Sequence, residues 1–162
     1  MKTQIDEKEI RKRLLEGHFY YEVINMRECI SEVFRKNPDR SKVFIENYFA
    51  VAFFTHARNL WEFFYAKDSN PKKFPRVNHY ILEWDITPSV EISKWYGMIN
   101  KYLSHLTYGR INDNGFPPID YIYVTYEHFR ELILEFLEKV SGDYKGPNLT
   151  SLLINMKNEV KS

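Results

Sequence analysis

The chain has 162 residues, of which 44% are hydrophobic and 17% aromatic; this is enough apolar material for one domain with a real core, and it excludes wholesale disorder. Lysine and arginine together number 23 against 22 acidic residues, which excludes a bulk electrostatic attraction to nucleic acid or to an anionic membrane. Cys29 is the only cysteine, and the N-terminal stretch MKTQIDEKEIRKR has no apolar segment. These two features exclude an internal disulfide and predict a cytoplasmic protein without a secretory signal.

Three helices are expected in the first half of the chain, because apolar residues recur there every three or four positions. They are a short charged helix over residues 6–16, an amphipathic helix over 18–36 and an almost wholly apolar central helix over 41–66. The central helix contains Arg58 and Glu62, which are costly to place in lipid. We therefore expect this helix to be buried inside a soluble bundle, and we expect no membrane partner.

Helix-capping residues mark the second half of the chain. Thr87 and the proline after it predict the start of a helix that runs to about residue 108, because threonine caps helix N-termini and proline suits the first helical position. In the same way, Thr125 predicts the start of a helix that runs to about residue 140. A last helix is expected over residues 148–160.

Two stretches lack a clean apolar period. They are residues 74–85 and residues 116–124, and the second includes IDYIYV, which is interpreted as a short strand or as an extended segment lying on the bundle. Long apolar helices with short connections predict an all-α fold. We expect a single domain over residues 1–162, a bundle of about five helices whose core spans about 18–140, followed by the C-terminal helix.

A polar stripe interrupts the central helix. Thr55, Arg58, Asn59 and Glu62 lie at positions i, i+3, i+4 and i+7, so they share one face, and Arg58 can pair directly with Glu62. One interpretation is a structural ion pair that fixes helix packing, since a buried charge needs a partner. The other is that Arg58 faces a cleft and binds an anion while Glu62 orients it. His56 lies on a different face and is expected to pack.

A second polar group lies in INKYLSHLTYGR, residues 99–110. Its polar members are Asn100, Lys101, Ser104, His105, Thr107 and Arg110. Lys101 and His105 lie one helical turn apart on one side, and the helix macrodipole favours the charged form of a histidine near a C-terminus. Such a histidine can serve as a general acid or base near neutral pH. The alternative interpretation is a half-exposed helix end with a capping histidine.

The segment NKYLSH resembles the motif of HEPN-type helical domains, in which an arginine is followed by a polar residue and, after four to six residues, by a histidine. Asn100 stands where the motif has arginine, Lys101 takes the polar position and His105 takes the histidine position. The chain also resembles a group of uncharacterised bacterial proteins that pair H-A-R-N-L-x-x-F-F with I-N-K-x-x-x-H-L-T-x-x-R. Its residues 56–64 and 99–110 match these two segments.

The HEPN resemblance implies an up-and-down helical bundle, often dimeric, that cleaves RNA without a metal ion. In such cleavage a ribose 2′-hydroxyl attacks the adjacent phosphate, a histidine moves the proton and an arginine stabilises the growing charge. Catalysis in this chain would use His105 with Lys101 and Arg110. The residues that would bind the substrate are Arg58, Asn59, Glu62, Asn100 and Thr107. Asn100 cannot supply the fixed positive charge of the motif's arginine, which favours a non-catalytic relative.

Two classes of function therefore remain open. The favoured class is a dimerising interaction or binding module that docks a protein partner, a nucleotide or RNA. The alternative is a metal-independent ribonuclease, in a toxin or phage-defence role, that uses His105. No cofactor or metal is expected, because the five histidines lack the spacing of metal sites in helical bundles and the six glycines form no phosphate-binding loop.

Aromatic residues are frequent for one domain, and several lie close together in the sequence. These are Trp61, Phe63, Phe64, Tyr65, Trp84, Trp95 and Tyr96. Their helical spacing predicts core packing. Exposed members would instead form a homodimer face, which the near-zero net charge favours over a platform for stacking nucleic-acid bases.

Overall fold

The structure is a computed structural model, and it describes residues 6–34, 42–66, 75–104 and 119–159. Every regular element in these ranges is a helix and none is a strand, which confirms the all-α fold class. No helix within them combines the length and the apolar character that crossing a membrane requires. The relation of this bundle to HEPN domains stays a prediction.

The two N-terminal helices expected over residues 6–16 and 18–36 form one continuous helix. Its parts are α1 (Glu7–Leu14), the π-helix η1 (Leu15–Phe19) and α2 (Tyr20–Phe34). The wider turn of the π-helix takes up Gly17 without a break. The separation predicted at this glycine is therefore wrong, because the π-helix shifts the helical register and keeps both Leu15 and Phe19 in the core.

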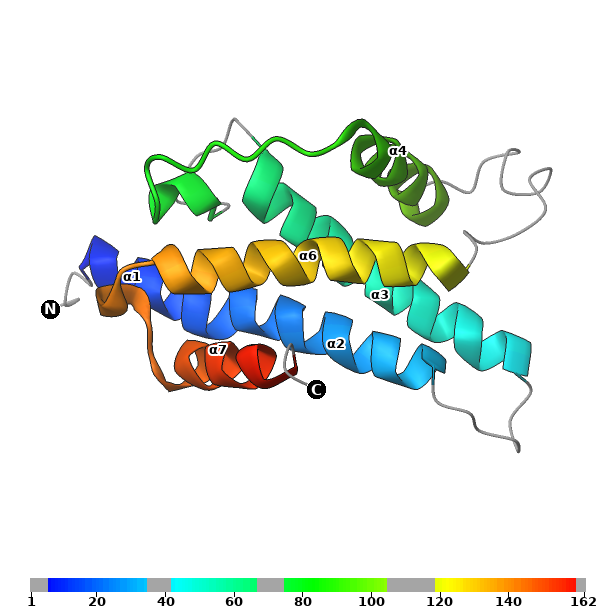
Figure 1. Cartoon of the computed structure of the whole chain (residues 1–162), viewed down its shortest axis with the longest axis horizontal. Helices are drawn as coiled ribbons and strands as arrows, with labels where there is room; N and C mark the ends of the chain where they lie inside the picture. Colours follow the sequence, from blue (N-terminus) through cyan, green and yellow to red (C-terminus); the bar gives the residue numbers. More distant parts are fainter. Residues whose placement is uncertain (1–5, 35–41, 67–74, 105–118, 160–162) are drawn as a thin grey trace, which may run out of the picture.

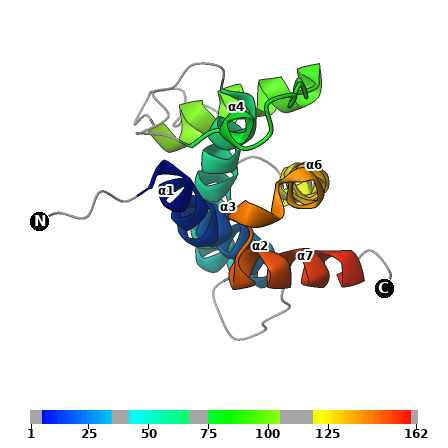
Figure 2. The same cartoon turned by 90° about the vertical axis from the view of Figure 1, so that its left-hand side faces the viewer.

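Four further helices complete the described bundle. They are α3 (Lys42–Tyr65), α4 (Val90–Ser104), α6 (Ile119–Lys139) and α7 (Pro147–Glu159), with the single turns η2 (Val77–His79) and η3 (Gly142–Tyr144). Figure 1 shows α6 running beside the α1–α2 helix, with α3 crossing obliquely. Figures 1 and 2 place α7 on one side of this layer, against α2 and α6, and place α4 with the segment 75–89 on the opposite side. With α1 to α2 counted as one, the described residues form five helices, which agrees with the predicted bundle of about five, although two of the six expected helical segments are merged.

Two helices begin at residues that differ from the expectation. α4 begins at Val90, because the Ser89 hydroxyl oxygen accepts the backbone N–H of Ile92 at 3.2 Å and caps the helix in place of Thr87. α6 begins at Ile119, so IDYIYV is helical and is neither a strand nor an extended segment. Both predicted starts were therefore wrong.

Thr125 is an interior residue of α6 and not its cap. Its side chain is buried in a small apolar gap between helices, beside Trp95 and Phe129. The β-branched and aromatic residues of IDYIYV favour a strand. However, Ile122 lies two helical turns before Phe129, so it extends the buried stripe of α6 toward the N-terminus of the helix. Packing against the bundle overrides the local preference.

Aromatic rings form the centre of the core. Phe136 of α6 has no exposed area, and its ring centroid lies 5.0 Å from that of Phe19 and 5.2 Å from that of Phe63. The seven aromatic residues singled out in the sequence are buried or half-buried, and none of them is exposed. The expected core packing is confirmed for six of them, whereas Tyr96 lies outside the core cluster. They offer no exposed face to a second copy, so the homodimer stays a prediction without their support.

The C-terminal helix α7 is attached to the long N-terminal helix through Glu16. The Glu16 carboxylate accepts the backbone N–H groups of Gly146 at 2.6 Å, Asn148 at 3.0 Å and Leu149 at 3.1 Å. N–H groups at the start of a helix have no partner inside the helix, and they lie at the positive end of its dipole. One carboxylate in η1 thus caps a helix that is 130 residues away in the sequence.

Glu16→Ala is expected to lower the free energy of unfolding by ~2 kcal/mol, because three backbone N–H groups at the start of α7 lose a charged acceptor. Urea unfolding followed by circular dichroism measures this change. Glu9→Ala is the matched control: Glu9 pairs with Arg13 on the exposed side of α1, and its loss should cost no more than about 0.5 kcal/mol. Equal losses in the two variants would contradict the capping role.

Thr125→Val is expected to raise the free energy of unfolding by ~1 kcal/mol. The Thr125 hydroxyl is buried and has no hydrogen-bond partner among the described residues, and valine keeps the shape of the side chain without the polar group. The urea midpoint of the variant against that of the wild type measures the change. A lower midpoint in the variant would show that the hydroxyl is satisfied in solution.

Candidate functional site

A cleft of about 800 Å³ lies between the long N-terminal helix, α3 and the segment that contains η2. We call it the α2–α3 cleft. Its polar lining residues are His18, Glu22, Arg58, Asn59, Glu62 and Arg76. Phe19 and Phe63 form part of its apolar wall. A few convergent polar groups on a largely apolar wall are typical of sites for small ligands.

Helical spacing places the polar residues on the cleft. His18 and Glu22 lie one turn apart on the N-terminal helix, and Arg58 and Glu62 lie one turn apart on α3. Phe19, which follows His18, and Phe63, which follows Glu62, are both buried in the core. The polar stripes of the two helices therefore line one cleft while their apolar stripes build the interior.

Arg76 is buried at the wall of the cleft, with 8% of its surface exposed. Its guanidinium donates to the Glu62 backbone carbonyl, and its Nη2 lies 3.3 Å from the Glu62 Oε2. The Tyr96 hydroxyl of α4 donates to the same carboxylate. Glu62 thus joins α3, α4 and the segment 75–80, a partnership that the spacing along α3 does not reveal.

Tyr96 extends this polar chain along α4. Burial raises the pKa of the Tyr96 hydroxyl, and the hydrogen bond to Glu62 raises it further. The Asn100 side chain, one turn on, also bonds to this hydroxyl, and its Oδ1 is buried with no partner among the described residues. Trp61 stacks on the Tyr96 ring with 4.4 Å between the centroids. The structure thereby links Asn100 to the polar stripe of α3.

Glu22 connects the cleft to His56. Its Oε2 lies 2.7 Å from the His56 Nδ1, and the Tyr21 ring meets the imidazole edge-on at 5.7 Å between centroids. His56 is half-buried and lies on a different face from the Arg58 stripe, as the sequence predicts. This contact ties α2 to α3 and engages one of the two acids of the cleft.

A second hollow of about 880 Å³ runs along α2 past Cys29, His56 and Tyr126. It is larger than the α2–α3 cleft, but its histidine is engaged by Glu22. Burial raises the pKa of the Cys29 thiol to about 11, so the thiol is protonated near neutral pH and is a poor nucleophile. We therefore favour the α2–α3 cleft as the functional site.

The structure covers part of the site predicted from the sequence. Arg58, Asn59 and Glu62 line the cleft together, as their spacing predicts. Asn100 is joined to them through Tyr96. The side chains of the remaining predicted residues lie outside the described part of the chain; these are Lys101, His105, Thr107 and Arg110. The contact expected between Lys101 and His105 stays a prediction.

Sequence reasoning missed four residues of this site: His18, Glu22, Arg76 and Tyr96. The one-turn spacing of His18 and Glu22 was a usable signal. Arg76 carries no local signal, because it lies in a segment without apolar periodicity and reaches Glu62 through the fold alone.

The donors of the cleft are suited to an anion. Guanidinium, imidazole and amide N–H groups stand beside an apolar wall, and guanidinium groups recognise phosphate and carboxylate with paired hydrogen bonds. Among the described residues, no group of three or more His, Cys, Asp or Glu side chains is placed to hold a metal ion. Comparisons with protein-family models, curated proteins and solved structures found no match for this chain.

Arg76→Ala is expected to lower the free energy of unfolding by ~2 kcal/mol, because it removes a buried guanidinium that donates to the Glu62 backbone carbonyl and pairs with the Glu62 carboxylate, whose side chain is 39% exposed. Chemical denaturation measures the loss. Arg13→Ala removes an exposed arginine from α1 and should change stability by no more than about 0.5 kcal/mol. A loss at Arg76 no larger than at Arg13 would show that the contacts of Arg76 with Glu62 contribute nothing.

Proposed function

We propose that this chain is a binding module whose α2–α3 cleft takes a phosphate-bearing ligand, either a small nucleotide or RNA. The gathering of Arg58, Arg76 and His18 on one cleft of about 800 Å³ carries the proposal. The planar guanidinium group matches phosphate oxygens with parallel N–H donors, and an imidazole adds another donor.

The two acids of the cleft are both engaged by protein groups. Glu22 contacts His56, and Glu62 accepts hydrogen bonds from Arg76 and Tyr96. Their charges are therefore partly compensated within the fold. The same contacts compensate the charge of Arg76, so the preference for a negatively charged ligand over a cation depends mainly on Arg58 and His18, which line the cleft from two separate elements.

The apolar lining of the cleft suits the remainder of a nucleotide. Leu14 and Pro75 stand beside the donors and can cover a base or a ribose. The resemblance to HEPN domains, which implies RNA as the substrate, points to the same ligand chemistry. Binding of this kind requires no catalysis, which agrees with Asn100 in the arginine position of the motif.

Arg58→Gln is expected to weaken binding at least about tenfold, because a neutral amide offers fewer donors and no charge to phosphate. The probes are a fluorescent oligouridylate, followed by anisotropy, and uridine monophosphate, followed by calorimetry, both with EDTA. Arg130→Gln is the matched control, since Arg130 pairs with Glu127 on α6 and does not line the cleft. Its affinity should match the wild type.

The two probes separate the sources of phosphate. Binding of uridine monophosphate identifies a small nucleotide, and binding of the oligomer alone identifies RNA. Binding of neither probe, or equal weakening by both substitutions, would overturn the proposal. Cleavage of the RNA in EDTA that disappears in a folded His105→Ala variant would replace it with the metal-independent ribonuclease.

A further inference from the structure

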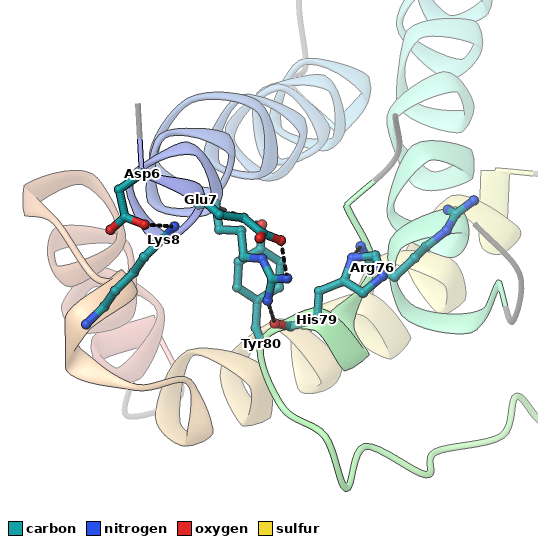
Figure 3. Close-up of polar contacts among 7 residues, drawn as sticks. Asp6, Glu7, Lys8, Arg76, His79 and Tyr80 are labelled. Atoms are coloured by element: carbon teal, nitrogen blue, oxygen red, sulfur yellow. Dashed lines mark hydrogen bonds and ion pairs between the residues drawn. The ribbon is translucent and has the colours of Figure 1, made fainter. Parts of the chain in front are cut away.

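The segment 75–80 passes the cleft in a tight turn that His79 holds together. The His79 Nδ1 accepts the backbone N–H of Arg76 at 3.1 Å, and the Arg76 carbonyl accepts the backbone N–H of His79 at 3.0 Å. A ring nitrogen accepts a hydrogen bond only while it is unprotonated. Figure 3 shows the imidazole beside the Arg76 backbone, with the Arg76 side chain extending away from it toward α3.

Cations face this turn from two elements. Arg11 of α1 donates from its Nη1 to the His79 carbonyl at 2.9 Å, and Arg76 belongs to the turn itself. The Tyr80 hydroxyl donates to the Arg11 carbonyl at 3.2 Å, and the Tyr144 ring meets the Tyr80 ring edge-on. Burial raises the pKa of the Tyr80 hydroxyl, so Tyr80 is neutral near physiological pH and the cations at the turn are Arg11 and Arg76.

The acids of this region are engaged by the same two arginines. Glu7 pairs with Arg11 at 2.7 Å, and Glu62 pairs with Arg76 at 3.3 Å. A protonated His79 ring would therefore lose its acceptor role and add a third positive charge beside two guanidinium groups. The turn in its observed form requires the neutral ring.

We propose that His79 is a positioning residue that fixes Arg76 in the α2–α3 cleft while its ring is neutral. Protonation removes the acceptor of the Arg76 N–H, frees the turn to change conformation and loosens the contact between the Arg76 guanidinium and Glu62. The cleft then holds an anionic ligand less tightly, so acidification favours release. The effect on the ligand rests on the proposed function, whereas the effect of His79 on Arg76 stands without it.

The pKa of His79 lies below its ordinary value of 6.5, first because of burial and then because of Arg11 and Arg76. The unfolded chain therefore takes up this proton at a higher pH than the folded protein does. The stability that His79 contributes is complete above pH 6.5 and is lost as the pH falls through the lowered pKa. Burial also lowers the pKa of His128, so acid destabilisation as a whole does not isolate His79.

Nuclear magnetic resonance of the full, uniformly labelled chain provides the local test. We expect a scalar coupling between the Arg76 amide nitrogen and the His79 Nδ1 near neutral pH. This coupling should vanish as the His79 ring titrates, and the Arg76 Nε resonance should shift with the same midpoint. Absence of the coupling at neutral pH, or an unchanged Arg76 Nε resonance after ring protonation, would overturn the proposal.

Two variants separate the acceptor from the charge. His79→Asn keeps an oxygen acceptor that does not titrate, so the Arg76 resonances should not follow the pH. His79→Leu removes the acceptor at every pH, so the Arg76 resonances near neutral pH should resemble those of the acidified wild type. The opposite pattern in either folded variant would overturn the positioning role.

The ligand arm uses the oligouridylate, because its phosphodiesters and bases do not titrate in this range. The dissociation constant of the wild type, divided by that of His79→Asn, should be near one at neutral pH and should rise to on the order of threefold at about pH 5. The two proteins differ only at residue 79, so effects of pH that do not involve this residue cancel in the ratio. A ratio that does not change with pH would overturn the effect on the ligand. Failure of both proteins to bind either the oligouridylate or uridine monophosphate at neutral pH would overturn the proposed function, and the resonance data would still decide whether His79 positions Arg76.

Discussion

The packing of aromatic rings around Phe136 is the constraint on which the rest of the structure depends. Its ring centroid lies 6.1 Å from that of Phe64 and 6.3 Å from that of Trp84, in addition to the closer contacts with Phe19 and Phe63. These rings come from η1, α3 and the segment before α4. Edge-on contacts between rings depend on orientation as well as distance. The cluster therefore fixes the rotation of each helix about its own axis, and not only its position.

The cleft is a consequence of that rotation. His18 precedes Phe19 in the sequence, and Glu62 precedes Phe63. Once the aromatic member of each pair is turned into the core, its polar neighbour is left at the edge, and the edges of the two helices meet in the α2–α3 cleft. The polar site and the apolar core are thus two results of the same packing.

Charged groups attach the segments that the aromatic core does not hold by itself. Glu16 caps α7, Arg11 donates to the turn at His79, and Arg76 donates to the backbone of α3. In each case a charged side chain bonds to backbone groups of a distant segment, where hydrogen bonds to charge are stronger than neutral ones. Arg76 both attaches the segment 75–80 to α3 and lines the cleft. In the proposed role of His79, a change of charge on its ring therefore affects this attachment and the cleft together.

The sequence by itself determined the all-α class, the location of most of the described helices and the shared face of Arg58 and Glu62, because helical periodicity is a local property that residue spacing records. It misplaced the start of α6 at Thr125, since a cap residue is also acceptable inside a helix whose packing continues upstream. Only the tertiary structure brought Arg76 to Glu62 and set His79 between cations. These residues lie on separate elements, and which faces of two elements meet depends on how the whole core packs, a property that no local pattern contains.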